Sequence, residues 1–449
     1  MKPVSVKWII HSTGGRFFGD PALLDTLIPN IVIDSRKCAG GALYVPIKGL
    51  RFDGHIFIDS ARENGAALVL TEHPLEKEPY ILVDSALDAL QNLAKDYLSL
   101  FSAPVIGITG SVGKTSTKEM VYSVLSQKYR MHKNLGNLNN QTGLPQTIFT
   151  MDDSFELSIM ELGTNHFGEI ERLSRMARPD ICLFTNIGIS HIEHFKTREG
   201  ILKEKMEMLT HAKPGVKTVV NGDDDLLCKV SGALTYGLGA HNEIRAENVE
   251  DLGLEGLSFT AILPEGSFPV RVMAPGKHQV YNALAAIALG TLFDLSVEQM
   301  QAGIAACRPQ HGRTDVIHTP RFTLIDDTYN AVLASAVTAL DLLATAKTRR
   351  VAILGDMREL GDQGESLHRQ VGAYAAKTAV DLLILAGEYA AAMEAGAKEG
   401  GLGCPIFCYP DRDALEAALP QLLKDGDTVL IKASRGLEFE HTVALLESI

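Results

Sequence analysis

The chain has 449 residues and a formal net charge of −13. This length exceeds one ordinary hydrophobic core and predicts about two to four domains. The acidic balance argues against a nucleic-acid-binding protein, whose surface is normally basic, so we expect no nucleic-acid partner.

The composition is that of a globular protein, with 46% hydrophobic and 22% charged residues. The N-terminal apolar run is too short for a signal sequence, and the chain has no stretch of 18 apolar residues. The six cysteines are scattered without a CxxC pair, which favours buried thiols in a reducing compartment over zinc ligands. We expect a cytoplasmic monomer without membrane insertion.

The first hundred residues predict a small mixed domain. Its second helix is expected to end before Pro104, because proline disfavours helix for the preceding residue. The first domain is therefore predicted to span residues 1–103. Its predicted elements are strands 31–34, 42–46 and 67–71 and helices 56–64 and 86–101.

The second block alternates buried strands with helices, the pattern of a parallel sheet covered on both faces. It is predicted to span residues 104–312 and includes an alternating, turn-rich stretch, 243–273, typical of antiparallel strands. Its other predicted elements are strands 105–109, 157–162, 181–186 and 217–221, a helix reaching about residue 129, and a helix at 279–293.

The third block, residues 313–449, predicts a Rossmann-like, doubly wound sheet, in which ligands bind at the carboxyl ends of the strands. The predicted fold is therefore α/β with three domains: a small α/β N-terminal domain, a central parallel-sheet domain and a doubly wound C-terminal domain. The predicted strands of the third block are 322–326, 350–355, 381–386, 405–409 and 428–432.

A phosphate-binding loop is the strongest chemical signal in the sequence. It follows a predicted strand and opens a predicted helix, which is the context such a loop needs. Lys114 is placed to reach the terminal phosphates, and the Thr115 hydroxyl to bind Mg²⁺. Ile108 stands where the full pattern has glycine, so the loop is the shorter TGxxGKT form. The residues expected to bind ATP here are Thr109, Gly110, Ser111, Val112, Gly113, Lys114, Thr115 and Ser116.

Two further strand ends supply candidate metal ligands. Glu161 ends the strand 157–162, and His191 follows the strand 181–186. A carboxylate oxygen beside a phosphate loop suits Mg²⁺. His194, three residues after His191, could form a helical metal pair with it, but we expect only His191 to face the site.

The run NLGNLNNQTGLP at 134–145 predicts an amide-rich loop. Amide side chains both donate and accept hydrogen bonds, as a substrate with phosphates and peptide bonds requires. A loop that only forms turns is the alternative.

Polar residues also gather at predicted strand ends of the third block. Asp327 suits ribose hydroxyls, and Tyr329 could stack on a base. The basic run after strand 428–432 could hold an anionic carboxylate. The residues singled out at that strand end are Lys432, Ser434 and Arg435.

From end to end, the order of motifs resembles the Mur ligases. The motifs are TGSVGKTSTKE, NLGNLNNQTGLP, MELGTNHFGEI, ISHIEHF, EKMEML, GKHQVYNALAA, HGRTD, IDDTYNA, GDMRELG and IKASRG. The resemblance implies an ATP-dependent amide ligase with three domains, Mg²⁺, and an acyl-phosphate intermediate in peptidoglycan synthesis. The segment from Asp34 to Phe57 resembles the UDP-binding part of that family's first domain.

The resemblance also implies site residues by motif. Lys114 and Thr115 would meet the triphosphate and its metal, and the metal ligands would be Thr115, Glu161, His191 and Lys205, with Lys205 as a carbamate. Catalysis would rest on Lys114, Lys205, His191 and Glu161. Asn282, Arg313, Asp327 and Tyr329 would contact ATP. The substrate would lie along Ser35, Arg36, Lys48, Asn139, Asn140, Thr142, Lys432, Ser434 and Arg435.

Within the family, GDMRELG followed by His368, together with IDDTYNA, is similar to the dipeptide-adding member. The implied substrates are UDP-N-acetylmuramoyl-tripeptide and D-alanyl-D-alanine. Another Mur ligase and a folylpolyglutamate-synthetase-like ligase are the alternatives among enzymes. A nucleotide-switched regulator is the alternative from a different class, but it would leave the polar strand ends of the third block unexplained.

Overall fold

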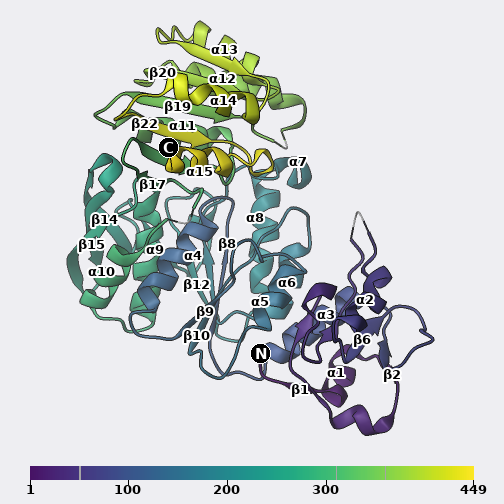
Figure 1. Cartoon of the computed structure of the whole chain (residues 1–449). Coiled ribbons are helices and arrows are strands. Elements are labelled where there is room, and N and C mark those ends of the chain that lie inside the picture. The colour runs from purple at the N-terminus through teal and green to yellow at the C-terminus, as the bar shows by residue number, and fades with distance from the viewer. Residues whose placement is uncertain (50–51, 310, 359) are drawn as a thin grey trace. The chain divides into compact units, whose positions relative to one another are not determined.

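The computed structural model describes residues 1–49, 52–309, 311–358 and 360–449. The chain forms two compact units, Met1–Arg245 with Ala285–Met300, and Ala246–Leu284 with Gln301–Ile449. Across the described residues, sheets of five, nine and six strands build the predicted α/β fold (Figure 1). No helix in these stretches is long and apolar enough to span a membrane.

The N-terminal segment, purple in Figure 1, folds around a small mixed sheet. Its elements are β1 (Val4–Ser5), α1 (Val6–Thr13), β2 (Arg16–Phe18), β3 (Leu27–Ile28), β4 (Ile31–Val32), β5 (Leu43–Tyr44), α2 (Ile58–Glu63), β6 (Leu68–Thr71), β7 (Tyr80–Leu82) and α3 (Ala86–Leu98). The sheet order is β2-β7-β6-β5-β4, and β2 is its antiparallel strand. Helix α1 begins where the Ser5 hydroxyl accepts the Trp8 amide at 3.2 Å and ends at Gly14, whose φ of 66° favours glycine.

The central part carries the nine-stranded sheet and the helices around it. Its elements are β8 (Val105–Thr109), α4 (Lys114–Leu125), β9 (Met131–Lys133), α5 (Gly143–Ile148), β10 (Leu157–Glu161), α6 (Glu169–Ala177), β11 (Ile181–Phe184), α7 (Ile192–Phe195), α8 (Arg198–Met206), β12 (Lys217–Asn221), β13 (Leu234–Gly237), β14 (Ile244–Asp251), β15 (Leu257–Leu263), β16 (Gly266–Val272), α9 (His278–Leu292) and α10 (Val297–Ala306).

The order of this sheet, β16-β15-β14-β13-β12-β11-β8-β10-β9, decides which loops meet. β8 lies between β10 and β11 and runs parallel to both. Glu161 pairs with Ile108, and Phe184 with Thr109, so the three strands end side by side. Loops that follow Thr109, Glu161 and Phe184 are thereby brought together, although they are far apart in sequence.

The predicted elements of this part are confirmed, with shifted ends. β15 and β16 are antiparallel, as the alternating stretch predicted. The loop prediction for 134–145 is wrong at its end, because α5 begins at Gly143, whose amide donates to the Asn140 side chain at 2.8 Å. Helix α4 ends at Leu125, earlier than predicted. The short strands β9 and β13 were missed, since three or four residues show no clear period.

The C-terminal part forms the six-stranded sheet, green to yellow in Figure 1. Its elements are β17 (Asp315–His318), β18 (Thr323–Asp327), α11 (Leu333–Ala344), β19 (Arg350–Gly355), α12 (Gly364–Ala375), β20 (Leu382–Ala386), α13 (Ala390–Glu399), β21 (Ile406–Tyr409), α14 (Arg412–Leu422), β22 (Thr428–Lys432) and α15 (Glu440–Ser448). The order is β17-β18-β22-β19-β20-β21, parallel except for the edge strand β17, which was not predicted.

This sheet is buried on both faces, as a doubly wound fold requires. Along β19, Ala352 and Leu354 pack into one apolar cluster, and Val351 and Ile353 into another. Successive side chains of a strand point to opposite faces, so the continuous apolar run of β19 reflects a core on each side.

Candidate active site

The phosphate loop joins β8 to α4, and two glycines allow its turn. A Cβ added at Gly110 would lie 1.9 Å from Oγ1 of Thr185, so no side chain fits there. Gly113 has a φ of 80°, in the left-handed region that favours glycine. α4 begins at the next residue, Lys114, and its N-terminus carries the partial positive charge that attracts phosphate.

Lys114 folds back over its own loop. Its Nζ donates to the carbonyl oxygens of Gly110, at 2.8 Å, and Ser111, at 3.3 Å. These bonds hold the ammonium beside the loop. Thr109 is fully buried and donates its hydroxyl to the carbonyl of Leu162 at 2.8 Å, so its side chain joins β8 to the end of β10.

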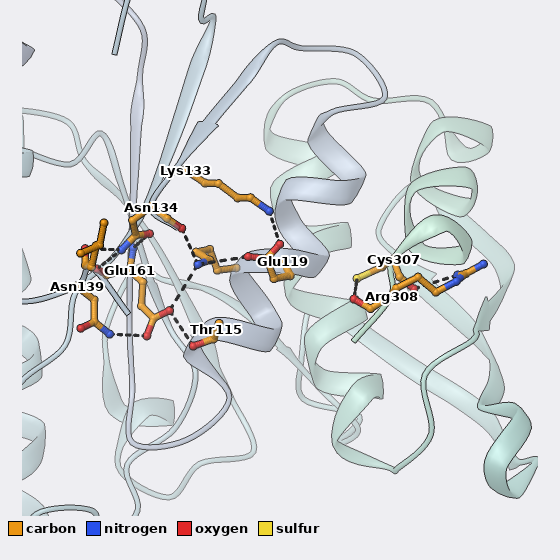
Figure 2. A network of polar contacts seen from close by, with 10 residues as sticks. Thr115, Glu119, Lys133, Asn134, Asn139, Glu161, Cys307 and Arg308 are labelled. Carbon is orange, nitrogen blue, oxygen red and sulfur yellow. Dashed lines mark hydrogen bonds and ion pairs between the residues drawn. The ribbon is translucent and has the colours of Figure 1, made fainter. Parts of the chain in front are cut away.

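Thr115, Glu161 and Asn139 form one network around the buried Glu161 carboxylate. The Thr115 hydroxyl donates to Oε2 of Glu161 at 2.9 Å, and Nδ2 of Asn139 donates to Oε1 of the same carboxylate at 2.9 Å. Figure 2 shows the Glu161 carboxylate between these two side chains. The structure thus brings together the phosphate loop, the end of β10 and the amide-rich loop.

The Thr115–Glu161 pair fits a Mg²⁺ ion in its chemistry. A hydroxyl and a carboxylate are hard oxygen donors, the kind this ion prefers. Glu161 is 2% exposed and Thr115 5%, so the negative charge lies in a shielded place beside the phosphate loop. Within the described residues, no group of three or more His, Cys, Asp or Glu side chains is arranged to hold a metal.

Two buried residues that support Glu161 were not singled out from the sequence. Lys118 is fully buried; its Nζ donates to the Asn134 carbonyl at 2.9 Å and lies 3.9 Å from Oε2 of Glu161. The Asn134 side chain bonds both backbone polar groups of Glu161, accepting from its amide at 3.0 Å and donating to its carbonyl at 3.1 Å.

Lys118 also lies 3.3 Å from Oε1 of Glu119. Glu119 pairs in turn with Lys133 (Figure 2). The spacing of Lys118 four residues after Lys114 puts both on one side of α4, and this was the signal available in the sequence.

Lys205 lies on α8 and is 4% exposed. Burial, assisted by the nearby Lys114 cation, holds the pKa of Lys205 well below its ordinary value, against the opposing effect of Glu204. A neutral amine is the form that reacts with CO₂.

His191 and His194 lie near the start of α7. His191 is exposed and has a φ of 57° at the N-cap of the helix. The ring of His194 lies against that of His166, with centroids 4.2 Å apart. His194 therefore packs against His166, and the helical metal pair with His191 was only the alternative to our expectation that His191 alone faces the site.

Asn140 and Thr142 take part in the start of α5. Oδ1 of Asn140 accepts from the Thr142 amide and hydroxyl, each at 3.2 Å, and from the Gly143 amide. These bonds shape the amide-rich loop, whereas Asn139 in the same loop turns to Glu161.

The predicted UDP-binding residues Ser35, Arg36 and Lys48 belong to two different local structures. Ser35 and Arg36 belong to a short 3-10 helix, Ser35–Lys37. The exposed Arg36 guanidinium bonds both oxygens of Asp34, at 2.9 and 2.8 Å, and lowers the pKa of that carboxyl to about 2. Lys48 is exposed, and its backbone forms an isolated antiparallel β-bridge with that of Asp53.

In the second compact unit, Asp327 and Lys432 form a buried ion pair. Nζ of Lys432 lies 2.5 Å from Oδ2 of Asp327 and 2.9 Å from the Asn330 carbonyl, and Lys432 is 2% exposed. Oδ1 of Asp327 accepts from the amide and hydroxyl of Thr314. Both predicted ligand-binding residues are thus bonded within the protein.

Tyr329 is close to two cations in this unit. The Arg313 guanidinium lies 3.8 Å from the centre of its ring, and that of Arg435 lies 5.8 Å away. The same stacking surface was predicted to receive a base. Arg435 is 64% exposed and also pairs with Glu440 at 3.2 Å.

Ser434 and Asn282 also lie in the second unit. The Ser434 hydroxyl accepts the Arg358 amide at 2.9 Å, which ties the ends of β22 and β19 together. Asn282 on α9 is buried and donates to Gln279 at 2.8 Å.

Comparison with known proteins places this geometry in a family. Residues 27–98 match the Mur ligase family catalytic domain, 108–290 the Mur ligase middle domain, and 312–435 the Mur ligase glutamate ligase domain. A UDP-N-acetylmuramoyl-tripeptide–D-alanyl-D-alanine ligase of Bacillus subtilis (strain 168) is 37% identical, over 96% of this chain and 95% of the relative. The chain belongs to the Mur ligase family.

Solved structures agree with this assignment. This Mur ligase matches MurF from Acinetobacter baumannii with a TM-score of 0.92 and 29% identity over the full length of both chains. It matches MurF from Thermotoga maritima in complex with ADP with a TM-score of 0.82 and 29% identity, over 93% of this chain and 97% of the other. The predicted resemblance is confirmed, and this Mur ligase is an ATP-dependent ligase that forms a carbon–nitrogen bond.

Proposed function

We propose that this Mur ligase joins D-alanyl-D-alanine to UDP-N-acetylmuramoyl-tripeptide, using ATP and Mg²⁺. The products are UDP-N-acetylmuramoyl-pentapeptide, ADP and phosphate. The observation that carries the proposal is the Thr115–Glu161–Asn139 network, because it joins a phosphate-binding loop to an amide-rich loop suited to a peptide. The name and 37% identity of the Bacillus subtilis relative support the choice of substrates.

The first step forms an acyl phosphate. An oxygen of the tripeptide's terminal carboxylate attacks the γ-phosphorus of ATP, and the bond from that phosphorus to the bridging oxygen of ADP breaks. Two anions must meet, so the ammonium of Lys114 offsets part of their repulsion. Mg²⁺, when bound by Thr115 and Glu161, supplies further positive charge to the phosphate oxygens.

The second step forms the amide. The free amine of D-alanyl-D-alanine attacks the carbonyl carbon, the bond to the phosphate oxygen breaks, and the nitrogen loses a proton. The amine must be neutral and held close to the carbonyl. We assign the exposed Arg435 and the neighbouring Ser434 to the side of the site that receives the dipeptide.

We further propose that Lys205 acts as a carbamate and, with His191, completes the metal site. An ammonium would be repelled by Mg²⁺, by roughly 8 kcal/mol at ~4 Å and an effective dielectric of ~20. The nitrogen of a neutral amine bonds to the carbon of CO₂ and loses a proton, and the burial of Lys205 favours the neutral amine. The product is an anion with two hard oxygens, which suit Mg²⁺.

The proposal includes the wider organisation of the enzyme. The domains span residues 1–103, 104–312 and 313–449 and bind the UDP end of the substrate, ATP, and the dipeptide with part of ATP, respectively. Ser35, Arg36 and Lys48 serve the UDP end, while Asn139, Asn140 and Thr142 serve the peptide. Asn282, Arg313, Asp327 and Tyr329 serve ATP. The enzyme acts as a cytoplasmic monomer.

Product mass tests the proposal directly. The full chain is mixed with ATP, Mg²⁺, D-alanyl-D-alanine and UDP-N-acetylmuramoyl-tripeptide carrying either lysine or diaminopimelate. We expect one pentapeptide product and one ADP per product, each dependent on both substrates. Parallel reactions offer a single amino acid, or glutamate with a folate, and ligation of either of these instead of the dipeptide would replace the proposal with another ligase activity. ADP release without any ligated product would favour the nucleotide-switched regulator.

A further inference from the structure

The segment after β11 is bonded to the tip of the phosphate loop through Asn186. The Ser111 amide donates to the Asn186 carbonyl at 2.9 Å. Oδ1 of Asn186 accepts from the Val112 amide at 2.9 Å, and Nδ2 donates to the Val112 carbonyl at 3.0 Å. The side-chain amide of Asn186 therefore bonds both the backbone N–H and the backbone carbonyl of Val112. Only this orientation of the side-chain oxygen and nitrogen satisfies both bonds.

More bonds fasten the same two loop residues. The Thr185 hydroxyl donates to the Val112 carbonyl at 2.8 Å. The Ser111 hydroxyl accepts from the Gly188 amide at 2.9 Å, and the Ser111 carbonyl accepts from the Ser190 hydroxyl at 3.3 Å. The segment from residue 185 to 190 is thus hydrogen-bonded to Ser111 and Val112 of the phosphate loop.

These hydrogen bonds fix the part of the phosphate loop that is otherwise most free to change conformation. Ser111 and Val112 stand between Gly110 and Gly113, and glycine restricts its neighbours little. Val112 is 51% exposed, so packing of its side chain does not hold it. Hydrogen bonds, including those to Thr185 and Asn186, therefore constrain the backbone of Ser111 and Val112.

We propose that Asn186 is a positioning residue that holds the phosphate loop in its binding shape before nucleotide arrives. Asn186 acts through Ser111 and Val112, whose amides are turned toward it, so these two residues serve ATP by the shape of the loop. A loop that is already ordered loses less conformational entropy on binding, which favours affinity. The inference rests on the proposed ATP-dependent ligation and deepens it.

The test compares substitutions of two asparagines at the ends of neighbouring strands. Asn186→Ala removes both side-chain bonds to Val112. Asn186→Asp keeps the acceptor, loses the donor and adds a negative charge beside a phosphate site. Asn221→Ala is the matched control, because Asn221 ends β12 and its side chain bonds the Asp223 amide at 3.1 Å instead of the phosphate loop.

The measurements are calorimetric binding of Mg²⁺-ADP to the full chain, and KM for ATP and for the UDP-substrate. We expect Asn186→Ala to weaken ADP binding about tenfold, the effect of roughly two neutral hydrogen bonds. Asn186→Asp weakens ADP binding further, and added salt reduces the difference in ADP affinity between the two variants. KM for ATP rises while KM for the UDP-substrate stays unchanged, which a general loss of folding would not produce. Asn221→Ala binds ADP as the wild type does.

Thr185→Val provides a second variant should Asn186→Ala fail to fold. It removes the other donor to the Val112 carbonyl and is expected to weaken ADP binding about two- to threefold. If the folded variants bind ADP as tightly as the wild type, or if Asn221→Ala loses as much ADP affinity as they do, the role of Asn186 is overturned. The proposed function would then still stand. A wild-type chain that binds no ADP would overturn the proposed function, and the inference with it.

Discussion

Asn139 donates its side-chain amide to Oε1 of Glu161 at 2.9 Å, across 22 positions of the chain. Asn139→Ala removes this link between the amide-rich loop and the carboxylate proposed for the metal. We expect KM for the UDP-substrate to rise about tenfold, the scale of a hydrogen bond to a charged group, with a higher Mg²⁺ requirement. Steady-state kinetics at varied Mg²⁺ measures both. The exposed Asn137 in the same loop supplies the control, Asn137→Ala, which should behave as the wild type.

Lys114→Ala should abolish most ligation without unfolding the protein. Loss of a cation at the transferring phosphoryl group is expected to reduce the rate by about 10²–10³-fold. Product formation measures the loss of ligation, and circular dichroism measures whether the variant is folded. Lys229→Ala, at an exposed lysine, is the control. Near-normal turnover of Lys114→Ala would remove the phosphate-loop assignment.

Lys205→Ala should lose most activity, and added acetate should restore part of it by supplying carboxylate oxygens in the vacated space. Lys203→Ala, two residues away on the same helix and exposed, should remain active. ¹³C NMR with labelled bicarbonate should show a carbamate signal that Lys205→Ala lacks. A bare amine in the fully liganded, CO₂-equilibrated enzyme would refute the carbamate.

Lys432→Met should destabilise the C-terminal sheet more than it changes substrate recognition. It leaves Asp327 charged and without its buried partner, and breaking such a pair costs about 3–5 kcal/mol. Thermal denaturation should show the loss, and Asp327→Asn in the same chain should recover part of it. The exposed Arg435→Met should leave the melting temperature unchanged. Equal melting temperatures for the two single variants would contradict the buried-pair interpretation.

His132 should make the folded state less stable in mild acid. It is 3% exposed, and burial lowers its pKa from 6.5 to about 4. Between these values the unfolded chain binds more protons than the folded one, so stability falls as pH falls from 6.5 to 4 and then levels off. The full effect is about 3 kcal/mol. Urea denaturation across this range measures it, and His132→Gln should show a smaller slope.

Local signals in the sequence determined the longer buried strands, the phosphate loop and the family. The run Val105–Thr109 is a strand as predicted, because five consecutive apolar or small residues suit a buried parallel strand. Gly110 and Gly113 stand where a side chain would clash or a left-handed φ is needed. The conformational requirements of such a turn depend on residues close together in the chain, so the order and spacing of residues in the sequence reveals them.

Tertiary structure decided which side chains meet. The order β11-β8-β10 brings Asn186 to Val112 and Glu161 to Thr115, 74 and 46 positions apart. It also paired Lys432 with Asp327, two residues that the sequence assigned separately to the substrate and to ATP. Sequence spacing carries no record of which strands become neighbours. Hydrogen bonds and ion pairs act over a few ångströms, so their partners exist only once the sheet has formed.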